Sequence, residues 1–271
     1  MNNYILIVFD SCRYDTFIAA RPKTMRKLGR VEKRWSWASW TAPSHYNLLT
    51  GLMPHTSPRN IFATEYYRRE YLKFNARLGV ENLEFKSFLP RMYLPVLLRS
   101  LGYRTRALVS LPVLNPTTPL NTGFDSWELM DRHNDMRAML PKLTFSEQAP
   151  TFWLLNVGET HYPYALPGEA SDAWPKISGV HGVLKHLDDP AASGKRTFSA
   201  GKLAVLRERQ IEAVRYLDKV VEELFDLAPE NTYVTITSDH GELFGEDGYF
   251  GHGPIQHEKV FEVPFVEGLL R

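Results

Sequence analysis

The stretch Tyr4-Ile5-Leu6-Ile7-Val8-Phe9-Asp10, close to the start of the chain, decides the fold class. Its six apolar residues are uninterrupted, rich in types that favour strands, and followed at once by an acidic residue. This pattern is typical of a central strand in a parallel sheet, which is buried on both faces and carries a polar residue at its carboxyl end. We therefore predict an α/β protein in which Asp10 lies at the carboxyl edge of the sheet.

Two later stretches, Thr151–Val157 and Thr232–Thr237, show the same pattern of a buried strand with polar chemistry directly behind it. The polar residues are Glu159 and His161 after the first stretch, and Asp239 and His240 after the second. Parallel strands end at one edge of a sheet, where α/β proteins bind their ligands, so we expect these side chains to share a site with Asp10.

Helical segments alternate with these strands. A helix is predicted around Leu94–Leu101, closed by Gly102, and it precedes a fourth strand at Tyr103–Ser110. Between Leu203 and Leu224, apolar residues recur at helical spacing opposite a charged face, which predicts a long helix packed on the sheet. The alternation predicts a doubly wound, mostly parallel sheet flanked by helices, an α/β/α sandwich.

The length and composition indicate how many domains the chain forms and which partners its charge can attract. With 271 residues, of which 44% are hydrophobic and 23% charged, residues 1–271 are predicted to form a single domain. The segment Lys185–Lys202 has little apolar periodicity and is interpreted as an exposed loop rather than a linker. The formal net charge of +1 gives no global attraction for nucleic acid or an acidic membrane, so an anionic substrate has to be attracted locally.

The single cysteine and the N-terminal stretch bear on location. Cys12 excludes an internal disulfide framework, makes a reduced compartment the simpler assumption, and is interpreted as a buried packing residue on a first helix turn. The apolar run Tyr4–Phe9 is too short to span a bilayer and has no basic flank or cleavage site. We expect a cytoplasmic protein without a membrane or nucleic-acid partner.

Asp10, Asp239 and His240 are the first candidate metal ligands. If their strands are neighbours, two carboxylates and an imidazole converge, and the like charges repel while losing hydration. A divalent cation removes both problems, and the ligand types suit Zn²⁺, Mn²⁺, Mg²⁺ or Ca²⁺ without choosing among them. Each motif also has a structural interpretation, because aspartate after a strand often caps a helix and Ser238–Gly241 suits a turn.

The segment Trp40-Thr41-Ala42-Pro43-Ser44-His45 supplies a hydroxyl for the same site. Proline is tolerated in the first turn of a helix, so Thr41 is placed near a helix start, and Gly51 would end that helix. The hydroxyl would then project where backbone N–H groups favour anions. Thr41 also fits a simple N-cap, an interpretation that needs no metal.

Short motifs spread over most of the chain resemble, in the same order, those of the alkaline phosphatase/sulfatase superfamily. They are Asp10–Asp15, Thr41–Gly51, Leu101–Thr105, Gly123–Asp125, Thr160–Tyr164, Ser238–Glu242, His252–Gly253 and Val263–Pro264. The resemblance implies an alkaline phosphatase-like fold for the predicted sandwich. It also implies that Asp10, Asp239 and His240 hold a cation, with the Thr41 hydroxyl as the fourth protein ligand.

The resemblance gives Thr41 the role of a nucleophile. Attack on phosphorus or sulfur would form a covalent Thr41 ester, which water hydrolyses in a second step. His161 and His252 are the catalytic candidates for meeting the equatorial oxygens of the transferred group. Either histidine could instead bind a second metal ion, with Glu159 as an added ligand, and single histidines are also common as surface or core residues.

Departures from the superfamily pattern bear on the substrate. Sulfatases carry a cysteine or serine, converted to formylglycine, where Thr41 stands; they carry an arginine where His45 stands, and commonly a second aspartate where Ser11 stands. Threonine cannot give the formylglycine aldehyde, which favours phosphate or phosphonate esters over sulfate esters. The chain ends soon after Phe265, so the C-terminal subdomain of many sulfatases is expected to be missing.

The leading hypothesis is a metal-dependent hydrolase of small anionic esters, a phosphatase or phosphodiesterase with a covalent Thr41 intermediate. One cation site is expected, and a second is left open. A transferase or mutase, which passes the group from Thr41 to an acceptor other than water, is the first alternative. A protein that binds a metal and an anion without turnover is the second. The metal, the leaving group and the oligomeric state are not determined by the sequence.

Overall fold

The computed structural model describes residues 1–56, 63–88, 92–176, 180, 182–183, 185–186 and 199–270. The strands of its main sheet are β1 (Asn3–Phe9), β2 (Glu32–Trp35), β3 (Arg104–Val109), β4 (Ser126–Leu129), β5 (Thr151–Val157), β7 (Thr232–Ser238) and β10 (Glu262–Leu269). They lie in the order β2-β10-β7-β1-β5-β3-β4. β10 runs antiparallel to β7 and β2, and the remaining pairs are parallel, which confirms the predicted mostly parallel sheet.

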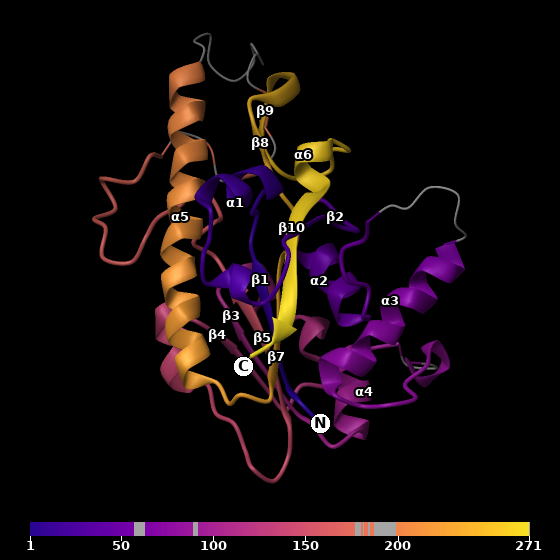
Figure 1. Ribbon diagram of the computed structural model, residues 1–271. Helices are drawn as coiled ribbons and strands as arrows, with labels where there is room; N and C mark the ends of the chain where they lie inside the picture. Colours follow the sequence, from indigo (N-terminus) through magenta and orange to yellow (C-terminus); the bar gives the residue numbers. More distant parts are fainter. Residues whose placement is uncertain are drawn as a thin grey trace.

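Helices cover both faces of this sheet. They are α1 (Tyr14–Ala20), α2 (Thr41–Leu49), α3 (Ala63–Leu78), α4 (Leu94–Ser100), α5 (Ala200–Leu227) and α6 (Glu258–Phe261). Short 3-10 helices are η1 (Met25–Lys27), η2 (Phe85–Phe88), η3 (Pro112–Leu114), η4 (Pro119–Asn121), η5 (Met136–Lys142) and η7 (Glu246–Gly248). Figure 1 shows α1 and α5 on one side of the sheet and α2, α3 and α4 on the other, which is the predicted α/β/α sandwich.

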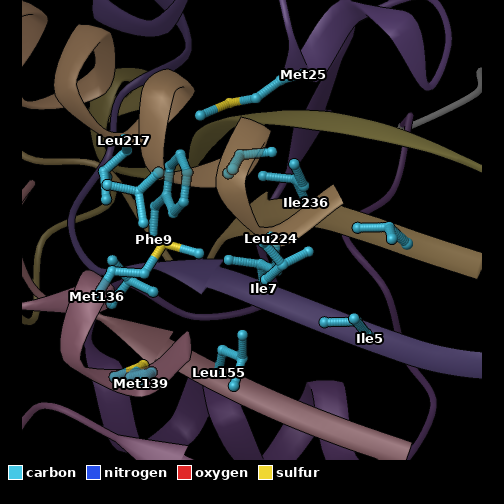
Figure 2. Packing of buried hydrophobic residues seen from close by; sticks show 14 of the residues in the cluster. Ile5, Ile7, Phe9, Met25, Met136, Met139, Leu155, Leu217, Leu224 and Ile236 are labelled. Carbon is cyan, nitrogen blue, oxygen red and sulfur yellow. The ribbon is translucent and has the colours of Figure 1, made fainter. Parts of the chain in front are cut away.

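The two faces of β1 enter two separate cores. Ile5, Ile7 and Phe9 pack with α5 and η5, and Figure 2 shows them beside Leu217 and Met136. The intervening residues of β1 belong to the second core, with side chains of α2, α3 and α4. Burial on both sides is why this strand is a continuous apolar run. Each buried side chain of this size contributes roughly 1.5–3 kcal/mol.

The strands that lead to the site end level with one another. Phe9 of β1 is in register with Ser238 of β7 and with Val157 of β5. The next residues along β1 and β7 are Asp10 and Asp239, so both acids leave the sheet at the same edge. A second, small antiparallel sheet has the strand order β6 (Lys185–His186), β9 (Tyr249–Gly251), β8 (Leu243–Phe244), and its strands β8 and β9 follow β7 in the chain.

The long helix α5 extends beyond the prediction at both ends. Ser199 caps it by accepting a hydrogen bond from the Lys202 N–H, and its last residue is Leu227. The interpretation of Lys185–Lys202 as a loop is only partly testable. Its first two residues form β6 and its last three begin α5, while residues 187–198 lie outside the described residues.

Two smaller predictions concern Cys12 and membrane segments. Cys12 is buried in the core, as expected, but it precedes the cap of α1 and so is not on a helix turn. Across the described ranges, no helix is both long enough and apolar enough to cross a membrane.

Candidate metal centre

Asp10, Asp239 and His240 meet at the carboxyl edge of the sheet. Each offers one ligand atom, and these atoms lie within 4.8 Å of one another. All three side chains are buried. The strands β1 and β7 are hydrogen-bonded neighbours, so residues about 230 positions apart are brought together by strand order alone.

The backbone around Asp239 occupies only one of its carboxylate oxygens. Oδ1 accepts hydrogen bonds from the N–H groups of Ser11 at 3.1 Å and His240 at 2.8 Å. Oδ2 is buried and has no hydrogen-bond partner. Buried carboxylate oxygens are rarely left without a partner, so Oδ2 is the atom that a ligand would use.

The electrostatics of the cluster fit a divalent cation. Burial, and then the negative charge of Asp10, raise the pKa of Asp239 well above its usual range. Burial lowers the pKa of His240 to about 3, which keeps the imidazole neutral, the form that binds metals. Burial opposes ionisation of Asp10 as well, but the neighbouring histidines, His161 first, hold its pKa below the usual range. Two carboxylates and a neutral imidazole in this geometry are a suitable donor set for Zn²⁺.

Thr41 is the first residue of α2, and its hydroxyl faces the cluster. Oγ1 lies 3.3 Å from Oδ2 of Asp10 and 3.3 Å from Nε2 of His240. The residue in the N-cap position is Trp40, whose side chain makes no capping hydrogen bond. The N-cap interpretation of Thr41 is therefore wrong, because the hydroxyl is directed across to β1 and β7 rather than to its own helix.

His45 lies one helical turn after Thr41 along α2. Its Nδ1 is 2.9 Å from the Thr41 carbonyl oxygen and 3.8 Å from Oδ2 of Asp239, and Nε2 is 3.5 Å from the amide nitrogen of Asn156. Burial lowers the pKa of His45. The position where sulfatases have an arginine thus holds a buried imidazole that contacts the backbone of Thr41.

His161 and His252 flank the same site. The ring of His252 is 4.3 Å from that of His240 and 5.4 Å from that of His161, between centroids. A hollow of about 520 Å³ is lined by residues 131–134 and 166–171 together with Trp174. Burial, and then the charge of His161, lower the pKa of His133 in this lining.

Glu159, which the sequence left open as an added ligand of a second metal ion, is not in the cluster. Its Oε1 accepts a hydrogen bond from the Met136 N–H at 2.8 Å, and Tyr216 of α5 is close enough to interact electrostatically with it. The side chain thus points into the core beneath η5 and α5. It is Thr160, the next residue, that touches the site, because its hydroxyl donates to the Asp10 carbonyl at 2.7 Å.

The burial of Glu159 predicts a pH dependence of stability. Burial raises its pKa from 4.5 to about 7, so the folded state keeps a proton that the unfolded state has lost. The free energy of unfolding should therefore fall as pH rises through this window, by about 3 kcal/mol. Glu159→Gln should reduce the measured fall by this amount, as determined by denaturant unfolding on both sides of the window.

The exposed Glu230 provides the control, since Glu230→Gln should leave the pH dependence as it is in the unchanged chain. The measurement is repeated with Zn²⁺ added. If Glu159→Gln reduces the stabilisation by Zn²⁺ while Glu230→Gln does not, Glu159 is a metal ligand and the description above is wrong.

Comparison with known proteins identifies the family. The sulfatase family model matches residues 2–266. The chain belongs to the sulfatase family. No curated protein matches the sequence of this sulfatase-family member.

Solved structures of the alkaline phosphatase superfamily share the fold of this sulfatase-family protein. The C-terminal periplasmic domain of EcEptC from Escherichia coli, in complex with Zn, has 14% identity and a TM-score of 0.58, covering 100% of this chain and 73% of that one. The soluble domain of lipooligosaccharide phosphoethanolamine transferase A from Neisseria meningitidis has 13% identity and a TM-score of 0.53, with coverage of 99% and 76%. A putative sulfatase from Bacteroides thetaiotaomicron has 16% identity and a TM-score of 0.56, with coverage of 98% and 64%.

The contacts of three polar residues of this sulfatase-family site were not predicted from the sequence. Ser11 was noted only as a departure from the superfamily pattern, and Glu242 was given no role although it stands inside the motif Ser238–Glu242. Gln210 had a clearer signal, because it interrupts the apolar stripe of α5 as a polar residue on the buried face. Its amide nitrogen donates to the carbonyl oxygens of Ser11 at 2.9 Å and Thr160 at 3.0 Å.

Proposed function

We propose that this protein is a metal-dependent hydrolase of phosphate or phosphonate esters, with Thr41 as the nucleophile. One observation carries the proposal: the Thr41 hydroxyl lies 3.3 Å from both Asp10 and His240, which belong to the candidate cation cluster. A structural threonine would not need to be directed at a carboxylate and an imidazole of two different segments. A nucleophile does need this arrangement.

Asp10, Asp239, His240 and the Thr41 hydroxyl would hold the cation, and Zn²⁺ is the first candidate. The related domain from Escherichia coli was solved in complex with Zn. When bound, the cation would lower the pKa of the hydroxyl and neutralise charge on the transferred group. Thr41 then attacks phosphorus, its Oγ forms the covalent ester, and the alcohol leaves. Water later hydrolyses the ester and restores the hydroxyl.

The identity of the proposed nucleophile favours a phosphorus ester over a sulfate ester as the substrate. Threonine cannot be converted to the formylglycine aldehyde of sulfatases, although the chain belongs to that family. The hollow beside His133 offers room for the alcohol part of the ester. The cytoplasmic location and the small-molecule substrate stay predictions.

A screen tests this proposal. Purified protein is assayed on p-nitrophenyl phosphate, bis-p-nitrophenyl phosphate, a p-nitrophenyl phosphonate and p-nitrophenyl sulfate, each with Zn²⁺, Mn²⁺, Mg²⁺ or Ca²⁺ after treatment with a chelator. We expect metal-dependent release of p-nitrophenol from at least one phosphorus ester and much slower release from the sulfate. Faster cleavage of the sulfate, or cleavage that survives the chelator, would contradict the proposal.

A transferase is the second candidate, because two of the similar structures carry the name phosphoethanolamine transferase. The two functions differ in the acceptor of the group held on Thr41. Release of p-nitrophenol and of inorganic phosphate is therefore compared as simple alcohols are added. Equal release supports hydrolysis, whereas phosphate release that falls behind p-nitrophenol release supports transfer.

A further inference from the structure

His252 turns one ring nitrogen toward a group of buried polar side chains. Its Nδ1 lies 3.4 Å from Oγ of Ser11 and 3.7 Å from Oε2 of Glu242. The two nitrogens of an imidazole lie on opposite edges of the ring, so Nε2 points away from this group. The ring centroid is 4.3 Å from that of His240, whose Nε2 is 3.3 Å from the Thr41 hydroxyl. The ring of His252 thus lies beside His240, which contacts the hydroxyl of the proposed nucleophile.

Ser11 determines which atom donates in its contact with His252. Its hydroxyl donates to Oδ1 of Asp10 at 3.0 Å, and a carboxylate can only accept. Serine has one hydroxyl hydrogen, so the contact with Nδ1 uses an oxygen lone pair and the ring N–H donates. The backbone of Ser11 is in the left-handed region at a φ of 60°, and its N–H is bonded to Asp239, so the hydroxyl is held in place.

Glu242 brings a second acceptor to the same ring nitrogen. Its side chain is fully buried, and Oε1 accepts hydrogen bonds from the Tyr164 hydroxyl at 2.6 Å and from the Gln210 amide at 3.3 Å. The other oxygen, Oε2, is buried without a hydrogen-bond partner. Buried carboxylate oxygens are normally hydrogen-bonded. The Nδ1 of His252 lies 3.7 Å from Oε2, so a small movement of the ring would bring its N–H into hydrogen-bonding distance.

We propose that Glu242 is a positioning residue that, with Ser11, keeps the proton of His252 on Nδ1 and leaves the Nε2 lone pair free to accept a proton on the other side of the ring. Carboxylates set the tautomer and orientation of imidazoles in this way at metal and catalytic sites. The inference rests on the proposed function, because it assigns His252 to the second step of hydrolysis. A lone pair on Nε2 makes His252 an acceptor there, whereas the sequence suggested a donor to substrate oxygens.

In the second step, His252 and Thr41 account for the protons that the attacking water molecule releases. The oxygen of a water molecule bonds to phosphorus while one of its protons passes to Nε2 of His252. The bond between phosphorus and Oγ of Thr41 breaks, and Oγ takes a proton from the imidazolium. The carboxylate of Glu242 stabilises the imidazolium between the two transfers.

Nitrogen-15 NMR of the full chain reads the tautomer without any turnover. The signals of His252 are assigned by their loss in His252→Asn. We expect the proton on Nδ1, and a mixture of tautomers in Glu242→Gln and in Ser11→Ala. Glu246→Gln is the matched control, because that nearby carboxylate is bonded to Arg13 and should leave the tautomer unchanged. A proton on Nε2, or an unchanged tautomer in both variants, would overturn the positioning.

Rapid mixing with p-nitrophenyl phosphate reads the consequence for catalysis. Glu242→Gln should lower kcat by about 10–100-fold, with KM and the initial burst of p-nitrophenol preserved, so that phosphorylated Thr41 accumulates. Glu242→Asp should restore part of the rate. A joint loss of burst and kcat in a folded Glu242→Gln protein would overturn the role in the second step. If the unchanged chain cleaves no ester, the proposed function fails, and the NMR result still decides the positioning.

Discussion

Replacing Thr41 by alanine is expected to lower the turnover of a phosphate ester by roughly 10⁴-fold or more, because the attacking oxygen is lost. The change removes a hydroxyl whose contacts are Asp10 and His240 and leaves α2 intact, so the fold should persist, while the cation keeps three of its four proposed protein ligands. Steady-state kinetics measure the loss, and mass spectrometry of the quenched unchanged enzyme should find a phosphoryl group on the peptide that contains Thr41.

The other threonine of this helix region supplies the control. Thr50 follows α2, and its hydroxyl donates to the Asn47 carbonyl at 2.7 Å, away from the cluster. Thr50→Ala should keep full activity with at most a small loss of stability, and Thr41→Ser should keep measurable turnover. If Thr41→Ala loses less than about tenfold, another group attacks and the proposed mechanism has to be given up.

Replacing Asp239 by asparagine is expected to raise the stability of the metal-free protein and to weaken cation binding. Burial and Asp10 raise the pKa of Asp239, so without a cation its ionisation weakens the fold as pH rises above the ordinary value of 3.8. Asp239→Asn removes this loss and should be the more stable protein at neutral pH when no metal is present. Turnover should nevertheless fall on the order of a thousandfold, since several kcal/mol of transition-state stabilisation are lost.

Thermal unfolding with and without Zn²⁺ measures the effect of Asp239→Asn on cation binding. At a free concentration of about 100 times Kd, Zn²⁺ should stabilise the unchanged chain by about 2.7 kcal/mol, or about 5–10 °C in Tm, and more strongly at higher pH. Asp239→Asn should gain little. Asp218→Asn is the control, because that carboxylate caps backbone N–H groups around Thr24 and should cost stability without changing the response to Zn²⁺. Equal responses of Asp239→Asn and the unchanged chain would remove Asp239 from the site.

The candidate metal ligands could be predicted because they follow strands that are buried on both faces. Such strands are continuous apolar runs, and the residue after the run lies at the carboxyl edge of the sheet. Asp10 and Asp239 were found in this way, and the pairing of β1 with β7 brings them together. The same reasoning failed for Glu159, two residues after β5, because the turn that follows the strand directs its side chain to the Met136 N–H instead.

The contacts of Ser11, Glu242 and Gln210 could not be predicted. A serine inside a metal motif, a glutamate after a histidine and a glutamine on a helix each have many structural uses, and their spacing in the chain does not say which groups they meet. Gln210 contacts Ser11 only because helix α5 packs beside the carboxyl edge of the sheet, where Ser11 lies. The position of α5 depends on the packing of its whole apolar face.

The sequence by itself determined the class of fold, the strands that carry the acids, and the set of residues from which a metal centre can be made. These features are local, because hydrophobic periodicity and the end of an apolar run depend on neighbours along the chain. The tertiary structure alone decided that Thr41 faces Asp10 and His240 rather than capping α2, that Glu159 points into the core, and which ring nitrogen of His252 meets Glu242. Such directions depend on how helices and turns dock on the sheet, which is fixed by the packing of side chains far apart in sequence.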